Sequence, residues 1–313
     1  MVRRWLAVRH QLLQIVIAVI CCAAGVAVLY QPGHGVVIMH SRAGSSQSVL
    51  PGGGKRLFPG RRIIALYGEP DTPVLGALGE QSLTASITRV TDLAKQYQDD
   101  VTSVRVLPAF EIIATVASDT SMNDDSYSRF ADMRTLATWV GSAKQHGIYV
   151  VLDLQPGRSD FITQAQQFAP LLGQPNVGLA LDPEWRLAPD QLPLEQIGTV
   201  SADEVNKTAE WLAALVRDRH LPQKLFVVHQ FRTSMITDRA ALDTSHTELA
   251  YVIQMDGQGS QPEKENSWQA ITANPPSDKI GFGWKNFFAK DTPMRSPQDT
   301  MQLTPRPVYV SYQ

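Results

Sequence analysis

The sequence predicts an α/β protein whose main domain is a (β/α)8 barrel of the TIM type, preceded by an N-terminal transmembrane or signal helix and a flexible linker. Three observations lead to this fold class. First, apolar, strand-like runs alternate with amphipathic helical segments. Second, eight of the apolar runs follow residue 60, which is the number of strands in such a barrel. Third, the first apolar run is not followed by the Gly-rich turn that is typical of doubly wound sheets. A chain of 313 residues also has room for a barrel of about 250 residues and a segment before it.

Residues 1–30 have the character of a membrane anchor. Three arginines precede an uncharged, mainly apolar run from Leu12 to Tyr30, which is close to the roughly 20 residues that cross a bilayer. Positive charge before the run predicts that the remainder lies outside the cytoplasm. A cleaved signal peptide is the alternative, because small alanines lie near the end of the run. We therefore expect an extracytoplasmic protein, either membrane-anchored through this helix or secreted.

The next segment, residues 31–60, is predicted to be a flexible linker. It is rich in Gly, Ser and Pro and shows no sustained period of either 2 or 3.6 residues. The two cysteines, Cys21 and Cys22, precede it, so we expect neither disulfides nor thiol chemistry in the barrel domain at 61–313.

The barrel domain is predicted from the alternation of its elements. The candidate strands are Ile63–Tyr67, Val104–Pro108, Ile148–Leu154, Val177–Leu181, Leu225–Gln230, Leu249–Met255, Ile280–Trp284 and Val308–Tyr312. The candidate helices are Ser82–Gln98, Arg129–His146, Phe161–Leu172 and Ala202–Arg219. The last begins with the clearest signal, since Ser201 and Glu204 have the spacing of a capping box. Strands separated by helices predict a parallel sheet with helices outside it.

Composition and missing motifs exclude several classes of function. With 43% hydrophobic residues and a formal net charge of −2, the chain has no basic surface for nucleic acid. Phosphate-binding glycine motifs and the G-x-S-x-G turn of serine hydrolases do not occur. Histidines are too scattered for a multi-histidine metal site. We expect no cofactor and no metal, with a hard-cation site of Asp153, Asp182, Glu184 and Asp256 left open as an alternative.

Polar residues follow most of the predicted strands, where barrel enzymes place their active sites. The candidates are Tyr67, Glu69, Glu111, Asp153, Gln155, Arg158, Asp182, Glu184, Trp185, His229, Gln230, Arg232, Asp256 and Trp284. Asp153 and Gln155, like Asp182 and Glu184, are two residues apart and would face the same side of an extended chain. The recurrence of such residues predicts one polar site at the mouth of the barrel.

Several carboxylates in one concave site suit the cleavage of a glycosidic bond. They raise one another's pKa, so that one carboxyl group can stay protonated and donate to the leaving oxygen while another acts as nucleophile or base. Tyr67, Phe110, Trp185 and Trp284 are candidate rings for contact with sugar faces, or alternatively for packing at the barrel rim. The three arginines Arg158, Arg186 and Arg232 have two interpretations, compensation of the clustered carboxylates or binding of an acidic sugar.

The segment LALDPEWR resembles the D-x-E motif that ends the fourth strand in barrel glycoside hydrolases of chitinase-like and muramidase-like families. Residues 61–313 also resemble a group of uncharacterised, exported bacterial proteins with a glycoside-hydrolase-like barrel, through LDLQPGRSDF, LALDPEWR, HQFR, FGWKNF and VSYQ. The resemblance implies that Glu184 is the general acid and Asp182 its partner. The further upstream aspartates of chitinases are absent, since Val177, Gly178 and Ala180 stand in their places.

The leading hypothesis is therefore a barrel of the cell envelope that cleaves a polysaccharide with paired carboxylates. Glu184 is the candidate acid, and Asp153, Asp182 and Asp256 are the candidates for nucleophile or base. The alternative is a non-catalytic barrel that binds a glycan or a partner protein.

Overall fold

The computed structural model describes residues 26–31, 34–40, 48–70, 72–98, 103–122 and 124–313. It divides the chain into two compact units, Met1–Gln47 and Ser48–Gln313. In the first unit, β1 (Val26–Gln31) pairs antiparallel with β2 (His34–His40). These strands occupy the end of the expected anchor and part of the expected linker. Both segments contain valines, which favour strands.

The expected membrane helix lies mostly outside the described residues, since the description begins at Val26. Of the helices that the structure does describe, none combines the length and the apolar character needed to span a membrane.

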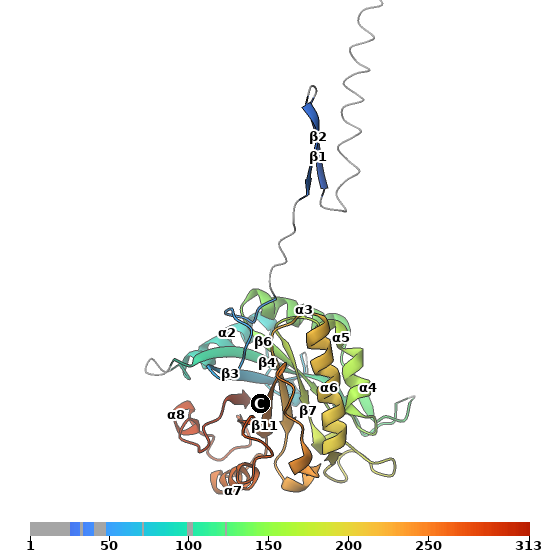
Figure 1. The fold of residues 1–313 in the computed structure, drawn as a ribbon. Coiled ribbons are helices and arrows are strands. Elements are labelled where there is room, and N and C mark those ends of the chain that lie inside the picture. Colours follow the sequence, from blue (N-terminus) through green and yellow to red (C-terminus); the bar gives the residue numbers. More distant parts are fainter. Residues whose placement is uncertain (1–25, 32–33, 41–47, 71, 99–102, 123) are drawn as a thin grey trace, which may run out of the picture. The chain divides into compact units, whose positions relative to one another are not determined.

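The second unit is built around a closed barrel of eight parallel strands (Figure 1). The barrel strands are β3 (Arg61–Gly68), β4 (Arg105–Ala117), β6 (Tyr149–Leu154), β7 (Val177–Leu181), β9 (Lys224–His229), β11 (Leu249–Met255), β12 (Gly281–Asn286) and β13 (Tyr309–Tyr312). Each pairs with the next in chain order, and β13 pairs with β3 to close the ring. The predicted eight-stranded parallel barrel is thereby confirmed.

Alternate residues of each strand face the barrel interior, as the two-residue period of a strand requires. On β3, for example, Ile63 and Ala65 belong to one buried cluster, whereas Ile64 and Leu66 pack in a second cluster with the helices. The interior cluster also contains Tyr149 and residues from most of the other strands. The barrel centre is therefore a packed core up to the level where polar side chains begin.

The N-terminal end of the barrel is covered by the segment that precedes β3. Leu50 and Leu57 are fully buried and belong to the interior cluster. The amide of Leu57 donates to Oε1 of Gln223 at 2.9 Å, just before β9. The barrel unit thus begins before Arg61, because its first residues supply apolar side chains that fill the barrel interior.

Helices surround the strands (Figure 1). They are α2 (Leu83–Lys95), α3 (Met133–Gln145), α4 (Phe161–Gln167), α5 (Ala169–Leu172), α6 (Ala202–Asp218), α7 (Gln261–Thr272) and α8 (Pro297–Thr300). The α6 helix starts as predicted, since the Ser201 side chain accepts from the amide of Glu204. Its apolar face, which includes Val205, Ala209 and Leu212, is buried in the cluster between helices and strands.

Two regions depart from the simple strand and helix repeat. Strand β4 extends well beyond the predicted Pro108 because its second half pairs antiparallel with β5 (Ser128–Phe130). Between β9 and β11 the chain forms only short elements, η3 (Thr233–Met235), β10 (Ile236–Thr237) and η4 (Arg239–Ala241). Strand β10 pairs with β8 (Val200–Ser201).

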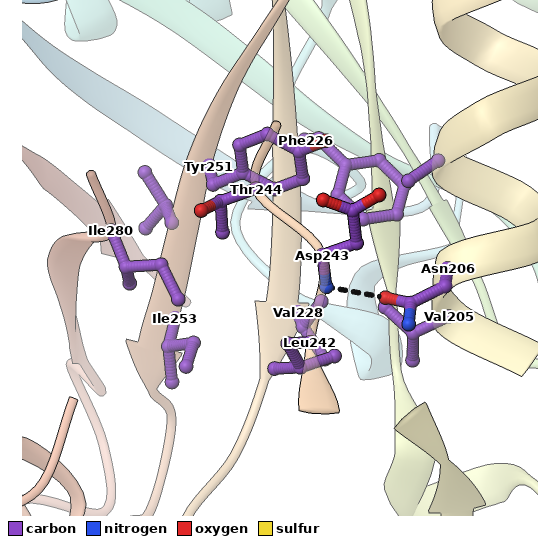
Figure 2. A pocket seen from close by; sticks show the side chains of 12 residues that line it. Val205, Asn206, Phe226, Val228, Leu242, Asp243, Thr244, Tyr251, Ile253 and Ile280 are labelled. Carbon is purple, nitrogen blue, oxygen red and sulfur yellow. Dashed lines mark hydrogen bonds between the residues drawn. The ribbon is translucent and has the colours of Figure 1, made fainter. Parts of the chain in front are cut away.

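The loop after η4 covers an apolar crevice against α6, β9 and β11. Figure 2 shows the residues that line it, and the amide of Asp243 donates to Oδ1 of Asn206 across its edge at 2.8 Å. The crevice encloses only about 10 Å³, which is about the volume of a single water site. We therefore regard it as a packing feature.

Candidate active site

The candidate site lies at the carboxyl ends of the barrel strands, where the interior rows change from apolar to polar. On β3 the interior row continues from Ala65 to Tyr67, and on β9 it continues from Val227 to His229. Register places Tyr67 opposite Glu111 of the neighbouring strand β4. Because all these side chains point inward at one level, residues far apart in the sequence meet at the top of the core.

His229 is the centre of this polar layer. Its Nε2–H donates to Oε1 of Glu111 at 2.9 Å, and its Nδ1–H donates to Oδ2 of Asp256 at 3.0 Å. Burial alone would lower the pKa of His229, but the negative charges of Asp153 and Glu111 and the two hydrogen bonds raise the pKa well above its usual value. His229 is therefore an imidazolium held between two carboxylates.

Glu111 is a carboxyl group of the polar layer with a lowered pKa. It is fully buried, and burial alone would raise its pKa. The charge and hydrogen bond of His229, together with the charge of Lys285, outweigh burial and lower the pKa of Glu111. Glu111 and His229 therefore form a buried ion pair in the polar layer.

Asp153 forms a second group with Tyr67 and Gln155. The Tyr67 hydroxyl donates to Oδ2 of Asp153 at 3.0 Å, and Nε2 of Gln155 donates to the Tyr67 oxygen at 3.4 Å. Burial, and then the negative charge of Glu111, raise the pKa of Asp153 to about 6 against the opposing charge of His229. Asp153 and Gln155 do face the same side, as their spacing in the sequence predicted.

Asp182 is a buried carboxyl group of the polar layer. It is 3% exposed, and within the described residues its Oδ1 has no partner. Burial is the main reason that its pKa is raised well above the usual value, and the charges of Asp153 and Asp256 add to the effect. A buried acid of this kind stays protonated more readily than an ordinary aspartate.

Glu184 lies two residues further along, on the short helix η2 (Pro183–Trp185). Burial, and then the negative charge of Asp256, raise the pKa of Glu184 to about 7. The strand ends at Leu181, so Asp182 and Glu184 do not follow strand alternation as the sequence analysis assumed. Both nevertheless line the same cavity.

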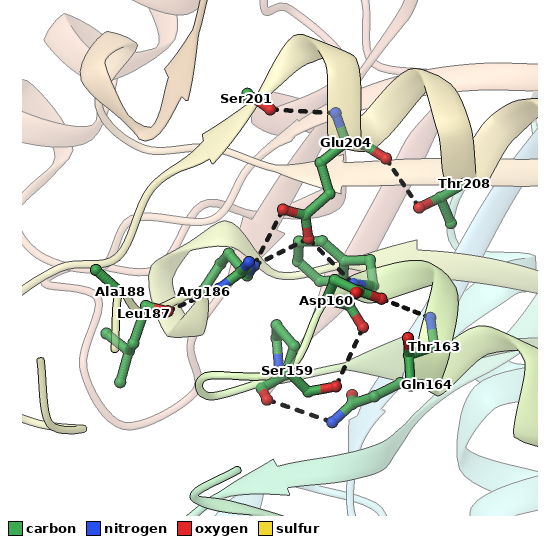
Figure 3. Close-up of polar contacts among 12 residues, drawn as sticks. Ser159, Asp160, Thr163, Gln164, Arg186, Leu187, Ala188, Ser201, Glu204 and Thr208 are labelled. Carbon is green, nitrogen blue, oxygen red and sulfur yellow. Dashed lines mark hydrogen bonds and ion pairs between the residues drawn. The ribbon is translucent and has the colours of Figure 1, made fainter. Parts of the chain in front are cut away.

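The loop that carries Glu184 and Trp185 is fixed to α6 by an ion pair (Figure 3). Nε of Arg186 donates to both carboxylate oxygens of Glu204, at 2.9 and 3.1 Å. Oε1 of Glu204 also accepts from the amide of Phe161, the first residue of α4. A further backbone bond from Gly198 to the Glu184 carbonyl measures 2.6 Å. These contacts hold the η2 loop against two helices.

Above the polar layer is a cavity of about 670 Å³, a size typical of small-molecule and glycan-unit sites. Of the sequence-predicted residues, its lining contains Tyr67, Gln155, Asp182, Glu184, Trp185, Arg232 and Asp256. Glu111, Asp153 and His229 lie directly behind these residues through the hydrogen bonds described above. The structure thus brings together ten of the predicted candidates, seven at the cavity surface and three behind it.

Four other predicted residues lie away from the cavity lining. Glu69 is paired with Arg129 of β5 at 3.0 Å, and Arg158 is paired with Asp125 at 2.9 Å. Gln230 is buried and donates to the Thr233 carbonyl. Trp284 is 1% exposed and packs edge-on against Trp268 of α7. We leave these four residues out of the candidate site.

Strand alternation explains the positions of two aromatic rings that were expected at the site. Trp284 and Phe110 occupy outward positions on β12 and β4, where they pack against helix residues. The inward row of β12 is Gly281, Gly283 and Lys285. Lys285 directly follows the predicted strand but was not among the candidate site residues, although the alternating glycines before it were a usable signal.

Lys285 is a buried cation of the cavity lining. Its Nζ lies 3.4 Å from the centre of the Tyr67 ring, and its charge lowers the pKa of Glu111. Lys264, Lys290, Phe231 and Glu263 are further lining residues that sequence reasoning did not single out. They belong to loops and to α7, where no strand register predicts a position.

A metal ion would find few donors here. Donor atoms of Asp153, Asp182 and His229 lie within 4.8 Å of one another, but both nitrogens of His229 already donate to carboxylates. The remaining donors are the two aspartates, which would suit only a hard cation.

Comparison with known proteins gives little further information. No family model matches the chain, and no curated protein matches it. Among solved structures, the chain is similar to the spore cortex-lytic enzyme SleL of Bacillus megaterium QM B1551, with a TM-score of 0.37 and 10% sequence identity. The match covers 82% of this chain and 54% of SleL, so the chain spans about half the length of that structure. So distant a match carries no argument, and the functional conclusion rests on the geometry of the site.

Proposed function

We propose that this protein is a glycoside-hydrolase-like barrel that cleaves a glycosidic bond in a polysaccharide of the cell envelope. The observation that carries the proposal is the pair of Glu184 and Asp256 in one cavity. Glu184 has a pKa of about 7, while Asp256 has one oxygen bound by the imidazolium of His229. An acid that stays protonated near neutral pH, beside a fixed carboxylate, is the arrangement that this chemistry requires.

In the proposed reaction, Glu184 donates its proton to the glycosidic oxygen as the bond from that oxygen to the anomeric carbon breaks. Asp256 acts on the anomeric carbon, either directly as nucleophile or by taking a proton from the attacking water. The bond from His229 to Oδ2 holds the Asp256 carboxylate in place, and Asp256 is part of the cavity lining.

The polar floor also supports a sugar as the ligand. Gln155, Asp182, Glu184 and Asp256 contribute polar side chains to the cavity lining, and the hydroxyl groups of a sugar ring can pair with such groups. Trp185 and Phe231 in the same lining offer ring surfaces for the sugar faces.

The location outside the cytoplasm is part of the proposal. It is supported by the arginines and the apolar run at residues 1–30. An anchored or secreted hydrolase would meet envelope polysaccharides there.

The test is hydrolysis by the full-length protein of a panel of cell-wall and storage polysaccharides, with released reducing ends quantified. We expect Glu184→Gln to lower turnover on the order of 10²–10⁴-fold, and Asp256→Asn to lower it comparably. Glu195→Gln is the matched control, because Glu195 is an exposed acid of the loop that follows η2. If no polysaccharide is cleaved, but one is bound equally by the wild type and Glu184→Gln, the protein is instead a non-catalytic glycan-binding barrel.

A further inference from the structure

The cavity lining contains cations that have no ion-pair partner among the described residues. Four cations line the cavity, Arg232, Lys264, Lys285 and Lys290. Lys264 has a dedicated partner, since its Nζ forms a buried ion pair with Asp291 and donates to the Lys285 carbonyl at 2.7 Å. The other three have no ion pair or hydrogen bond from the side chain among the residues that the structure describes.

Lys285 is the most informative of the three. Its side chain is 3% exposed, and its ammonium group contacts the rings of Tyr67 and Phe287, at 3.4 and 5.4 Å. Buried ammonium groups are costly unless they are paired and hydrogen-bonded. Ring contacts compensate part of that cost, but the three donors of the ammonium group still lack acceptors.

Arg232 and Lys290 are exposed at the rim of the same cavity. Arg232 differs in this respect from the two other arginines that the sequence analysis considered. Arg158 is paired with Asp125, and Arg186 is paired with Glu204. Arg232 contacts only the ring of Phe231, at 5.7 Å.

Among the described residues, the acids of the lining form no ion pair with these three cations. Oδ2 of Asp256 accepts from His229, and the carboxylate of Glu263 accepts from Ser260 at the start of α7. Burial raises the pKa of Glu184 to about 7 and that of Asp182 well above its usual value, so both ionise less readily than ordinary acids. An anionic ligand would supply the partners that Lys285, Arg232 and Lys290 lack among the described residues.

We infer that the polysaccharide bound in this cavity is anionic, and that its charged groups lie against Lys285, Arg232 and Lys290. The inference rests on the proposed function and adds the substrate class to it. Lysine and arginine bind carboxylate and phosphate groups alike. A uronic acid and a phosphate-bearing sugar are thus the two sources of the required charge.

The experiment measures binding, so that it does not depend on turnover. The full-length Glu184→Gln protein is titrated by calorimetry with oligosaccharides of a polyuronate, with the same oligosaccharides after reduction of their carboxyl groups to alcohols, and with a phosphate-bearing glycan. We expect one of the anionic glycans to bind about tenfold or more tightly than the reduced one. We also expect this preference to weaken as salt is added.

The double variant Arg232→Gln/Lys290→Gln in the same background should reduce the preference about tenfold. The matched control is Lys55→Gln/Arg306→Gln, which removes one lysine and one arginine that are exposed ahead of β3 and β13, at the opposite end of the barrel. This control should keep the preference.

Equal binding of the acidic and reduced glycans, binding of neither anionic glycan, or loss of the preference in the control would overturn the inference. The proposed function has a separate outcome. Cleavage of neutral glycans alone would support the proposed function and contradict the anionic substrate. Binding of an acidic glycan without cleavage of any glycan would support the charge preference and contradict the proposed function.

Discussion

Asp182 and Glu184 show how strongly position determines the behaviour of a carboxyl group. Asp182 is buried and Glu184 half-buried, both near other acids, and both have a raised pKa. Glu111 is buried at least as deeply, yet its pKa is lowered because His229 and Lys285 lie beside it. The site therefore separates its acids into protonated and ionised members through their neighbours.

The first prediction concerns Asp182 and stability. A carboxyl group whose folded-state pKa is raised favours the folded state at low pH, and this contribution is lost as pH rises through the folded-state pKa. Asp182→Asn removes the ionisation, so we expect it to raise the free energy of unfolding at pH 8 by about 1 to 3 kcal/mol. At pH 4 the same variant should have little effect.

Urea unfolding of the wild type and of Asp182→Asn at both pH values checks this expectation. Asp190→Asn is the control, because Asp190 is an exposed acid in the following loop. A variant that is less stable than wild type at pH 8 would show that the ionised carboxylate has a partner after all.

The second prediction separates the two tryptophans that the sequence suggested for sugar binding. Trp284 is 1% exposed among helix residues, whereas Trp185 is half-buried and lines the cavity. We expect Trp284→Ala to lower the free energy of unfolding by about 3 to 5 kcal/mol. Trp185→Ala should mainly weaken glycan binding.

Denaturant unfolding and glycan titration on both variants distinguish these effects. The assignment fails if Trp185→Ala proves as destabilising as Trp284→Ala while glycan affinity is unchanged.

At the scale of elements, the strands were predictable because each carries its own apolar run, whereas the site loops were not. The run Val177–Leu181 predicted β7 with its observed bounds. The fixing of the η2 loop by Arg186 and Glu204 depends on a contact with a helix that begins at Ala202, and no local pattern indicates it. Lys285 was missed for a related reason, since its role follows from strand register and not from its neighbours in the sequence.

The third prediction tests that loop. Glu204→Gln weakens the ion pair with Arg186, so the position of Glu184 and Trp185 should become less precise. We expect turnover to fall about tenfold, while the free energy of unfolding changes by about 1 kcal/mol or less.

Asp203→Asn is the matched control for this prediction. Asp203 occupies the same first turn of α6 but pairs with Lys207 on an exposed surface. Equal turnover of Glu204→Gln and the control would show that the ion pair does not position the loop.

At the scale of the whole molecule, the closed barrel positions the strand residues of the candidate site, since their inward rows end at the same level, while loops and α7 supply the rest. The sequence was sufficient to predict eight strands and the end of the barrel at which this cavity lies. It did not reveal that residues 48–60 belong to the barrel unit, because Leu50 and Leu57 stand in two short apolar pairs, Val49-Leu50 and Leu57-Phe58, next to glycines and prolines. Long-range packing of this kind has no periodic signal.

The fourth prediction concerns this cover. A chain that begins at Arg61 lacks both leucines and the Leu57 bond to Gln223. We expect its free energy of unfolding to be lower by about 4 kcal/mol or more than that of a chain beginning at Ser48. Equal urea midpoints for the two chains would contradict the placement of these leucines in the barrel interior.

The pH dependence of kcat/KM shows whether Glu184 is a general acid with a raised pKa. Because the acid must be protonated, we predict that kcat/KM on the cleaved polysaccharide falls tenfold per pH unit above about pH 7. The residual activity of Glu184→Gln should lack this fall. A kcat/KM that stays constant up to pH 9, or an alkaline fall that persists in Glu184→Gln, would contradict the assignment.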